Sequence, residues 1–329
     1  PTGAVTALLG APLLLWLLPR MRLGGGRPQL HSAMVLSTPA RPLKLLWIGG
    51  LLFALIALAL WFGRGVEGWQ WILDPQVVQW RTPRVLAAAG AGLMLALAGT
   101  LLQRLTGNPL ASPEIMGISA GAALALMAMV FLWPGAPLAA RLVLGCLGAL
   151  VTLLIIMGFA RRQSFSPERL LLVGIAISSL FDAVQILVLS MNDPRGQSLL
   201  GWLAGSTYHV QLPTSIMALV IAGGLLLLCL PLGRWLTLLP LGEDTPRSLG
   251  VPLARARLSI MLLAALLTAA ATLLVGPLSF IGLMAPHLAR LLGFNQARTQ
   301  LLAAGLLGAG VMVAADWLGR NLLFPTQLP

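Results

Sequence analysis

Apolar segments long enough to cross a bilayer follow one another along almost the whole chain. They lie near residues 4–18, 44–62, 85–103, 115–133, 137–160, 170–190, 212–232, 258–276, 278–292 and 299–318. A helical span needs about 20 apolar residues, and only helices or closed barrels satisfy the backbone within lipid. With 58% hydrophobic and 9% charged residues, the chain is predicted to be an all-α polytopic membrane protein with about ten transmembrane helices or partial crossings.

The basic residues are distributed unevenly over the predicted loops. If the first apolar segment ends in the cytoplasm, most of the 21 Lys and Arg residues fall on the cytoplasmic side. This is the positive-inside bias of membrane proteins. The net charge of +12 is therefore explained by topology, and we expect no nucleic-acid partner, because the basic residues are scattered singly without stacking aromatics.

Segment 80–122 combines a predicted span with two unusual ends. Residues 85–102 carry no charge and are rich in Gly and Ala, which favours a helix packed closely against other helices. Arg81 and Arg84 stand at one end of this span. At the other end, two prolines and Asn108 break the helix before the next one starts. These features predict a transport pathway and not a plain anchor.

A second signal lies in the cytoplasmic loop between residues 233 and 257. A short helix is predicted there, beginning near Asp244 or Thr245, with Pro246 in its first turn and Gly250 after its end. Such a helix would protrude from the membrane and serve as a docking site for a partner.

The chain resembles the permeases of ATP-binding-cassette importers for iron chelates and vitamin B12 in four separated motifs. These are RTPR at 81–84, NPLASPEIMGISAGA at 108–122, LGEDTPRSLGV at 241–251 and GPLSFIGLMAPHLARLLG at 276–293. Three stretches, QRLTGNPLASPE, AGSTY and ADWLGR, are most similar to the second half of double-length members that carry ferric hydroxamates. The resemblance covers nearly the whole chain. It implies the type II ABC importer permease fold, the bacterial inner membrane and an iron(III)-hydroxamate siderophore as cargo.

The resemblance also implies that the chain is offset in register. Residues 1–20 resemble the family's last helix, which normally follows the segment that here comes last. We therefore expect 1–20 to be the last helix of a preceding homologous half, 21–43 a cytoplasmic linker, and 44–329 a permease half lacking its final helix. A circularly permuted or truncated single permease is the alternative. The Arg-rich, Gly-rich linker favours a homologous half in the same polypeptide.

ATP hydrolysis is expected on a partner subunit. Lys44 is the only lysine, so no G-x-x-x-x-G-K-[ST] phosphate-binding loop can form. We expect a transport permease and not an enzyme, with no cofactor on this chain and with ATP and Mg bound by a cytoplasmic ABC ATPase dimer.

The resemblance implies that the helix around 241–251 docks in a cleft of that ATPase, and a solvated loop is the alternative. The implied coupling residues are Leu241, Gly242, Glu243, Asp244, Thr245, Pro246, Arg247, Ser248, Leu249 and Gly250.

On the outer side, the resemblance implies a docking site for a periplasmic siderophore-binding protein. Arg81, Arg84 and Arg320 match the family's positions for pairing with acidic residues of that partner, where exposed charges steer encounter and orientation. The alternatives are topology charge, contact with lipid phosphate, or a pair between Arg320 and Asp316 four residues earlier.

On the inner side, the resemblance implies a gate formed by two loops. Asn108 and Leu110, with Ser166 and Pro167 before the next span, match the family's gate positions. An ordinary helix–turn–helix connection is the alternative at this place.

A few polar residues fall within predicted spans. Asp182 is the most unusual, since an acid inside a span costs about 2.5–3.5 kcal/mol on insertion scales. Asp182 and Gln185 are candidates for lining the cavity, and a hydrogen bond between them or to a neighbouring helix is an equal alternative. No metal site is predicted, because His31, His209 and His287 are isolated and lack ligand spacing.

Two other function classes fit parts of the sequence. Residues 117–121, GISAG, match the G-x-S-x-G pattern of serine hydrolases, but small residues opening a closely packed helix explain it more simply. A proton-coupled transporter would use Asp182 or Asp316, and it would need neither the 241–251 helix nor the outer arginines. Within the importer class, another iron chelate, haem or vitamin B12 is the alternative cargo.

Overall fold

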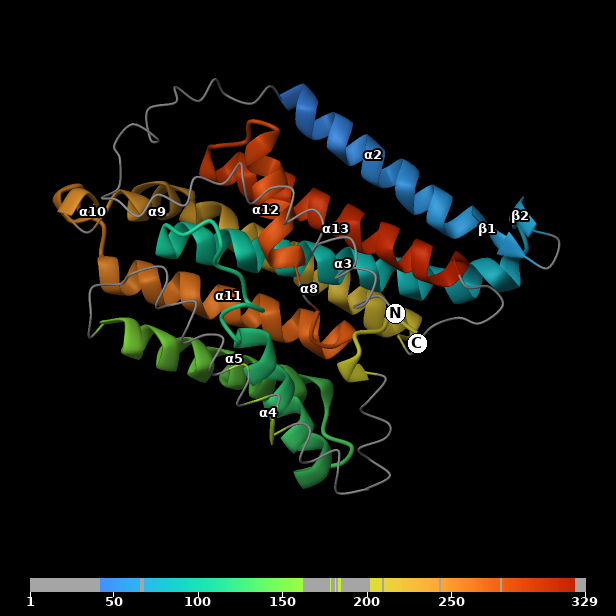
Figure 1. The fold of residues 1–329 in the computed structure, drawn as a ribbon, viewed down its shortest axis with the longest axis horizontal. Coiled ribbons are helices and arrows are strands. Elements are labelled where there is room, and N and C mark those ends of the chain that lie inside the picture. Colours follow the sequence, from blue (N-terminus) through green and yellow to red (C-terminus); the bar gives the residue numbers. More distant parts are fainter. Residues whose placement is uncertain are drawn as a thin grey trace.

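The computed structural model describes residues 42–65, 68–161, 202–208, 210–242, 244–278 and 280–322, with four single residues between 162 and 201. Residues 1–41, which include the expected last helix of a preceding half, lie outside this description. In chain order the elements are α2 (Pro42–Trp61), β1 (Phe62–Gly65), β2 (Gly68–Trp71), α3 (Pro75–Thr106), α4 (Ile118–Leu132), α5 (Leu138–Arg161), α8 (Leu212–Cys229), η3 (Leu230–Leu232), α9 (Gly233–Leu238), η4 (Leu239–Leu241), α10 (Asp244–Ser248), α11 (Leu253–Val275), α12 (Ile281–Leu291) and α13 (Ala297–Asn321) (Figure 1).

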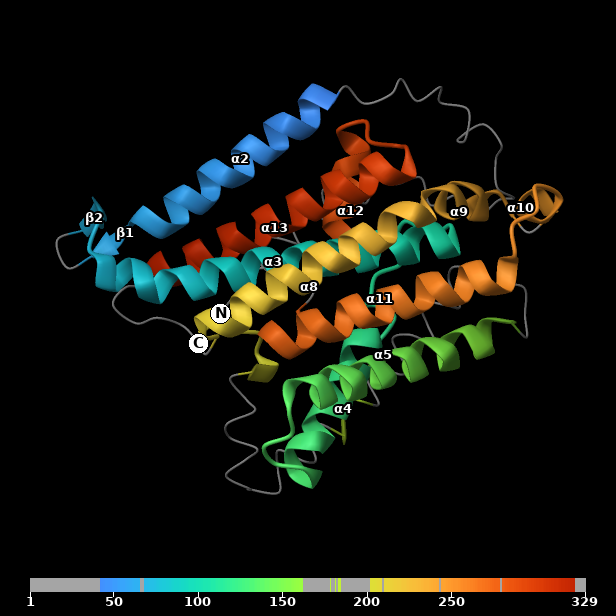
Figure 2. The ribbon, with the colours of Figure 1, turned by 180° about the vertical axis from the view of Figure 1, so that it is seen from behind.

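Helix α3 lies at the centre of the described bundle (Figures 1 and 2). It packs against α13, α11, α8 and α12, whereas α11 lies between α3 and the pair formed by α4 and α5. Helix α2 lies at the periphery against α13 and exposes large apolar side chains, among them Trp47 and Phe53. Such a continuous exposed apolar face is typical of contact with lipid.

Clear sequence signals mark both ends of α3. The side chain of Asp74 accepts a hydrogen bond from the backbone N–H of Gln76 (2.9 Å), and Pro75 occupies the first helical position. Both features favour a helix start. The helix ends before Gly107 and is 32 residues long. Because about 20 residues suffice to cross a bilayer, α3 extends beyond the apolar layer.

Small residues set the close approach of α3 to its neighbours. Gly92 faces the backbone of Gly308 in α13, and Gly99 faces the carbonyl group of Gly282 in α12, so a methyl group at Gly92 or Gly99 would clash with backbone atoms. Within lipid, helices associate mainly through such close packing, since lipid tails are as apolar as the side chains. The predicted closely packed, Gly- and Ala-rich helix is confirmed.

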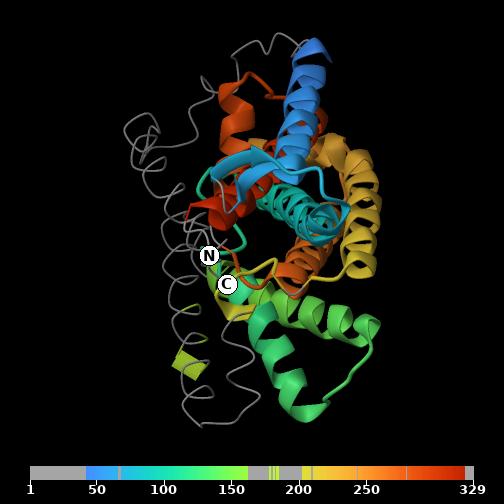
Figure 3. The same cartoon turned by 90° about the vertical axis from the view of Figure 1, so that its right-hand side faces the viewer.

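A β-hairpin at the end of α2 is a feature that the sequence analysis did not predict. Strands β1 and β2 pair in antiparallel fashion, with Phe62 opposite Trp71 (Figure 3). The rings of Phe62, Trp69 and Trp317 cluster, with centroids of Trp69 and Trp317 5.6 Å apart. This aromatic contact fixes the hairpin on the end of α13.

The prediction of an all-α membrane protein is confirmed for the described part of the chain. Apart from the short hairpin, its elements are helices, and six are long and apolar enough to cross a membrane: Leu43–Trp61, Pro75–Thr106, Leu138–Ile156, Leu212–Leu241, Leu253–Val275 and Ala297–Asn321. Helix α4 is apolar but shorter. The number of about ten spans stays a prediction, because segment 4–18 and most of 170–190 lie outside the described residues.

The substitution Gly99→Ala should lower the thermal stability of the detergent-solubilised protein. The added methyl group would push α12 away from α3, and overpacking of this kind costs about 1–3 kcal/mol. Gly223→Ala in α8 is the matched control, because nothing lies within 4 Å of the position of its new methyl group. Equal melting temperatures for the two variants would contradict the proposed role of this contact.

Candidate functional site

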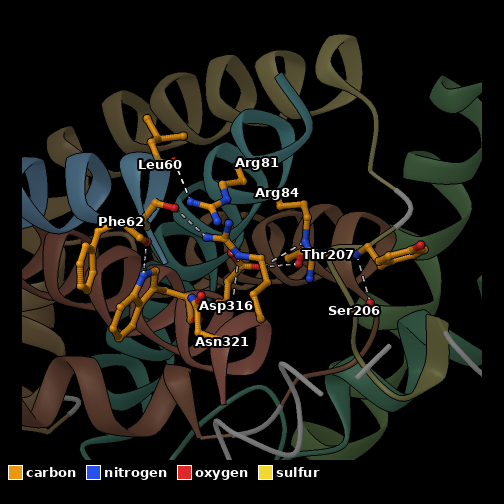
Figure 4. A network of polar contacts seen from close by, with 12 residues as sticks. Leu60, Phe62, Arg81, Arg84, Ser206, Thr207, Asp316 and Asn321 are labelled. Carbon is orange, nitrogen blue, oxygen red and sulfur yellow. Dashed lines mark hydrogen bonds and ion pairs between the residues drawn. The ribbon is translucent and has the colours of Figure 1, made fainter. Parts of the chain in front are cut away.

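A buried ion cluster lies where α3 and α13 meet at the hairpin end of the bundle (Figure 4). The side chain of Asp316 is fully buried, and its Oδ2 lies 2.9 Å from Nε of Arg320, one helical turn further along α13. Its Oδ1 lies 3.5 Å from Nε of Arg84 on α3. One carboxylate therefore faces two guanidinium groups, and the cluster keeps a net positive charge.

The segment before α8 joins the same cluster. The hydroxyl group of Thr207 donates a hydrogen bond to Oδ1 of Asp316 (2.6 Å). The guanidinium carbon of Arg84 lies 5.5 Å from the ring centroid of Tyr208, within the range of a cation–π contact. The cluster thus links three segments that are far apart in the sequence.

The end of α2 supplies backbone acceptors to two of the arginines, and the hairpin supplies a backbone donor to Asn321. Arg81 donates to the carbonyl oxygen of Leu60 (3.1 Å), and Arg320 donates to that of Ala59 (3.0 Å). On the hairpin itself, the backbone N–H of Arg64 donates to Oδ1 of Asn321 (2.6 Å). These bonds hold the outer ends of α2, α3 and α13 together.

A cavity of about 580 Å³ opens beside this cluster. Four arginines line it, together with both ends of the hairpin and the start of α3: Arg64, Gly65, Gln70, Trp71, Ile72, Leu73, Asp74, Val77, Trp80, Arg81, Arg84, Arg320 and Asn321. Guanidinium groups offer several N–H donors in a planar fork that matches a carboxylate. The cavity is therefore suited to an acidic side chain of a partner.

The three arginines predicted for docking all contribute to this cavity, but Arg84 and Arg320 are buried and ion-paired and do not stand as free surface charges. The pair between Arg320 and Asp316, which the sequence left open, is present. Sequence reasoning missed Arg64 and the pairing of Arg84 with Asp316. No sequence pattern connects them, because more than 200 residues separate Arg84 from Asp316. The docking role stays a prediction.

The predicted gate loop, residues 107–117, follows α3 at the opposite end and is folded by its own side chains. The backbone N–H of Leu110 donates to Oδ1 of Asn108 (2.9 Å), and that of Ile115 points to the hydroxyl group of Ser112 (3.3 Å). Asn108 is 4% exposed. The other two predicted gate residues, Ser166 and Pro167, lie outside the described residues, as do the cavity candidates Asp182 and Gln185.

Glu114 in this loop places a carboxyl group against the start of α12. Both carboxylate oxygens are buried, and within the described part of the chain neither has a hydrogen-bond partner. Burial raises the pKa of Glu114 from 4.5 to about 7. The carboxyl group therefore titrates near neutral pH.

The predicted docking helix is present as α10, which begins at Asp244 as expected. Pro246 is buried, while Leu241 and Leu249 expose large apolar side chains. Gly250 follows in the left-handed conformation (φ 73°), which favours glycine. Glu243, also among the predicted coupling residues, lies outside the described residues, and coupling itself stays a prediction.

Two further sequence features, the GISAG segment and His287, can be located in the structure. GISAG opens α4, where Gly121 lies directly against Gly148 and Thr152 of α5, so the small residues serve close packing. Nδ1 of His287 lies 3.5 Å from Arg290. Among the described residues, no group of three His, Cys, Asp or Glu side chains is arranged to hold a metal ion.

The sequence profile of the FecCD transport family matches residues 51–329. The chain belongs to this family. The iron(3+)-hydroxamate import system permease protein FhuB of Escherichia coli is 47% identical over the whole of this FecCD chain, which spans 50% of that protein. The Fe(3+) dicitrate transport system permease protein FecC of the same organism is 40% identical over 76% of each chain. The vitamin B12 import system permease protein BtuC of Vibrio cholerae is 36% identical over 80% of each.

A solved structure agrees with the family assignment. The FecCD chain is similar to an inward-facing, putative metal-chelate type ABC transporter, with a TM-score of 0.73 and 28% identity, over 88% of this chain and 93% of that one. The chain spans about half the length of the FhuB relatives that it matches.

Replacing Asp316 should strongly destabilise the permease. Asp316→Ala leaves two buried guanidinium groups without their carboxylate, and breaking a buried ion pair from one side costs about 3–5 kcal/mol. Asp74→Ala, at the exposed cap of α3, should cost only about 1 kcal/mol. Thermal unfolding in detergent compares the two, and a smaller loss for Asp316→Ala than for Asp74→Ala would rule out a stabilising role for the cluster.

The stability of the permease should depend on pH through Glu114. The native carboxyl keeps its proton up to about pH 7, whereas the unfolded one loses it near 4.5. The native chain thus binds the extra proton between these values, so stability falls as the pH rises through this window. Glu114→Gln cannot titrate and should show a flatter profile of melting temperature between about pH 5 and 7. Identical slopes for the variant and the wild type would refute the assignment.

Proposed function

We propose that this chain is one half of the membrane permease of an ATP-driven importer that moves iron(III)-hydroxamate siderophores from the periplasm to the cytoplasm. The observation that carries the proposal is the 47% identity to the iron(3+)-hydroxamate import permease FhuB over the entire chain. The relatives that import iron dicitrate or vitamin B12 match a smaller share of the chain, at lower identity. These relatives nevertheless define the alternative cargo, which is another iron chelate, haem or vitamin B12.

The length of FhuB supports the proposed organisation of the whole protein. Since this chain spans about half of FhuB, we propose that residues 1–20 belong to a preceding homologous half in the same polypeptide, that 21–43 link the halves, and that 44–329 belong to the second half. The complete protein would then have the type II importer permease fold and lie in the bacterial inner membrane. About ten of its helices would belong to this chain.

Two partners are assigned to the two ends of the bundle. The positively charged cavity at the hairpin end suits acidic side chains of a periplasmic siderophore-binding protein, because the four arginines exceed the nearby carboxylates. At the other end, α10 and the exposed leucines that flank it, Leu241 and Leu249, suit a cleft of a cytoplasmic ATPase dimer, which would bind ATP and Mg. A proton-coupled mechanism through Asp316 is disfavoured, since two guanidinium groups hold that carboxylate.

The test is import by the full-length permease reconstituted into proteoliposomes with its ATPase and binding protein. Arg81→Glu reverses a charge in the cavity and should impair import of iron-loaded hydroxamate siderophore by about ten-fold or more, because close like charges oppose docking. Arg141→Glu is the matched control, since Arg141 is exposed at the start of α5 and does not line this cavity.

The ATPase side is tested by Gly250→Arg, which adds a bulky cation beside α10 and should abolish import. Gly250→Ala controls for backbone strain at the positive φ, which costs about 1 kcal/mol, and should retain most import. Normal import by both Arg81→Glu and Gly250→Arg would refute the proposal. Import of vitamin B12 but not of the siderophore would keep the importer class and change the cargo.

A further inference from the structure

Arg104 occupies the last turn of α3 and bonds to three different elements. Its Nε donates to Oε1 of Gln300 on α13 (2.7 Å). Its Nη2 donates to the carbonyl oxygen of Asn295 in the turn between α12 and α13 (2.6 Å), and its Nη1 donates to that of Leu236 in α9 (3.3 Å). All three acceptors are uncharged amide oxygens, so the arrangement is not an ordinary ion pair.

One of these bonds leads to α10. Helix α9 continues through η4 towards α10, and Nη2 of Arg234 on α9 donates to the carbonyl oxygen of Leu249 at the end of α10 (3.2 Å). Leu236, whose carbonyl group binds Arg104, has a fully buried side chain. Because α9 is bonded to the end of α10 through Arg234 and to Arg104 through Leu236, a displacement of α10 would be carried to Arg104.

The other bonds of Arg104 lead to α13 and the turn before it, and from α13 to α12. Gln300 donates to the carbonyl oxygen of Pro286 within α12 (3.3 Å). The neighbour of Arg104 on α3, Gln103, accepts a hydrogen bond from Nη1 of Arg290 near the end of α12 (2.8 Å). The gate loop begins at Gly107, three residues after Arg104. The last turn of α3 is therefore bonded to α9 and α13 through Arg104 and to α12 through Gln103, directly before the gate loop begins.

Only arginine among the side chains can make this connection. Its guanidinium group carries five N–H donors in a rigid plane, so it reaches three acceptors in different directions at once. A lysine keeps the charge but concentrates its donors on one atom, and a glutamine has two N–H donors and no charge. Arginine is therefore the residue type that suits a position where several helices and turns meet.

We propose that Arg104 is a positioning residue that transmits the movement of α9 and α10 to the gate loop and α12. The proposal rests on the proposed function, in which an ATPase moves α10. Physical coupling between distant sites needs an element that both sites bias. The junction at Arg104 joins α9, which continues to α10, to the inner end of α3.

The test uses the full-length permease in proteoliposomes with its ATPase and binding protein, and it measures basal ATP hydrolysis, its stimulation by the loaded binding protein, and import. Arg104→Gln should leave basal hydrolysis within about two-fold of wild type and reduce import per ATP by at least about ten-fold, a typical size for coupling between sites. Arg104→Lys should fall between this variant and wild type. Arg255→Gln, at an exposed arginine in the first turn of α11, is the matched control and should import normally.

The outcomes separate this proposal from the proposed function. Normal import per ATP by Arg104→Gln, in an assay where the wild type is active, would overturn the role of Arg104 alone. A parallel loss of thermal stability, basal hydrolysis and import would assign Arg104 a merely structural role and would also overturn it. Failure of the wild type and Arg255→Gln to import or to hydrolyse ATP would overturn the proposed function and this proposal together.

Discussion

The close packing of α3 against four other helices is the contact on which the rest of the described structure depends. Glycines bring the backbones of α12 and α13 next to α3, as the facing pairs Gly92–Gly308 and Gly99–Gly282 illustrate. Because these helices are bound through their backbones, they leave little space for side chains to rearrange. The two clusters of buried arginines lie towards the ends of this helix, with Arg81 and Arg84 at one end and Arg104 at the other.

The cluster around Asp316 illustrates how buried arginines are held in a membrane protein. A buried guanidinium group without a counter-ion is costly, and Asp316 compensates Arg84 and Arg320 at the same time. Backbone carbonyl groups at the end of α2 take up further donors without adding negative charge. The cavity can therefore remain positive while its arginines are held in fixed positions, which favours recognition of a carboxylate over general attraction of anions.

The parts of the structure that the sequence predicts are local. The start of α10 at Asp244, the break after α3 and the close packing of the Gly-rich span depend on residues that are neighbours in the chain or in one helix. The pair between Arg320 and Asp316 was within reach for the same reason, since four residues separate the two. The hairpin was missed because each strand has only four residues, too few for a clear alternation of polar and apolar positions.

The contacts that the sequence does not predict join distant segments. Arg84 and Asp316, or Arg104 and Asn295, are about 190 or more residues apart, and a single sequence contains no signal for such pairing. The buried carboxyl group of Glu114 was overlooked because acidic residues in loops are usually solvated. Its burial follows only from the return of α12 to the loop after α3, which is a property of the tertiary fold.

The length of α3 has a mechanical consequence. At a rise of 1.5 Å per residue, its 32 residues, with Pro83 inside the helix, span about 48 Å, and a tilt of the whole helix by about 5° around its middle would move each tip by about 2 Å in opposite directions. Such a tilt would pivot on the contacts that Gly92 and Gly99 make with α13 and α12. A small rotation there would displace both ends of the bundle at once, without any change in the length of the helix.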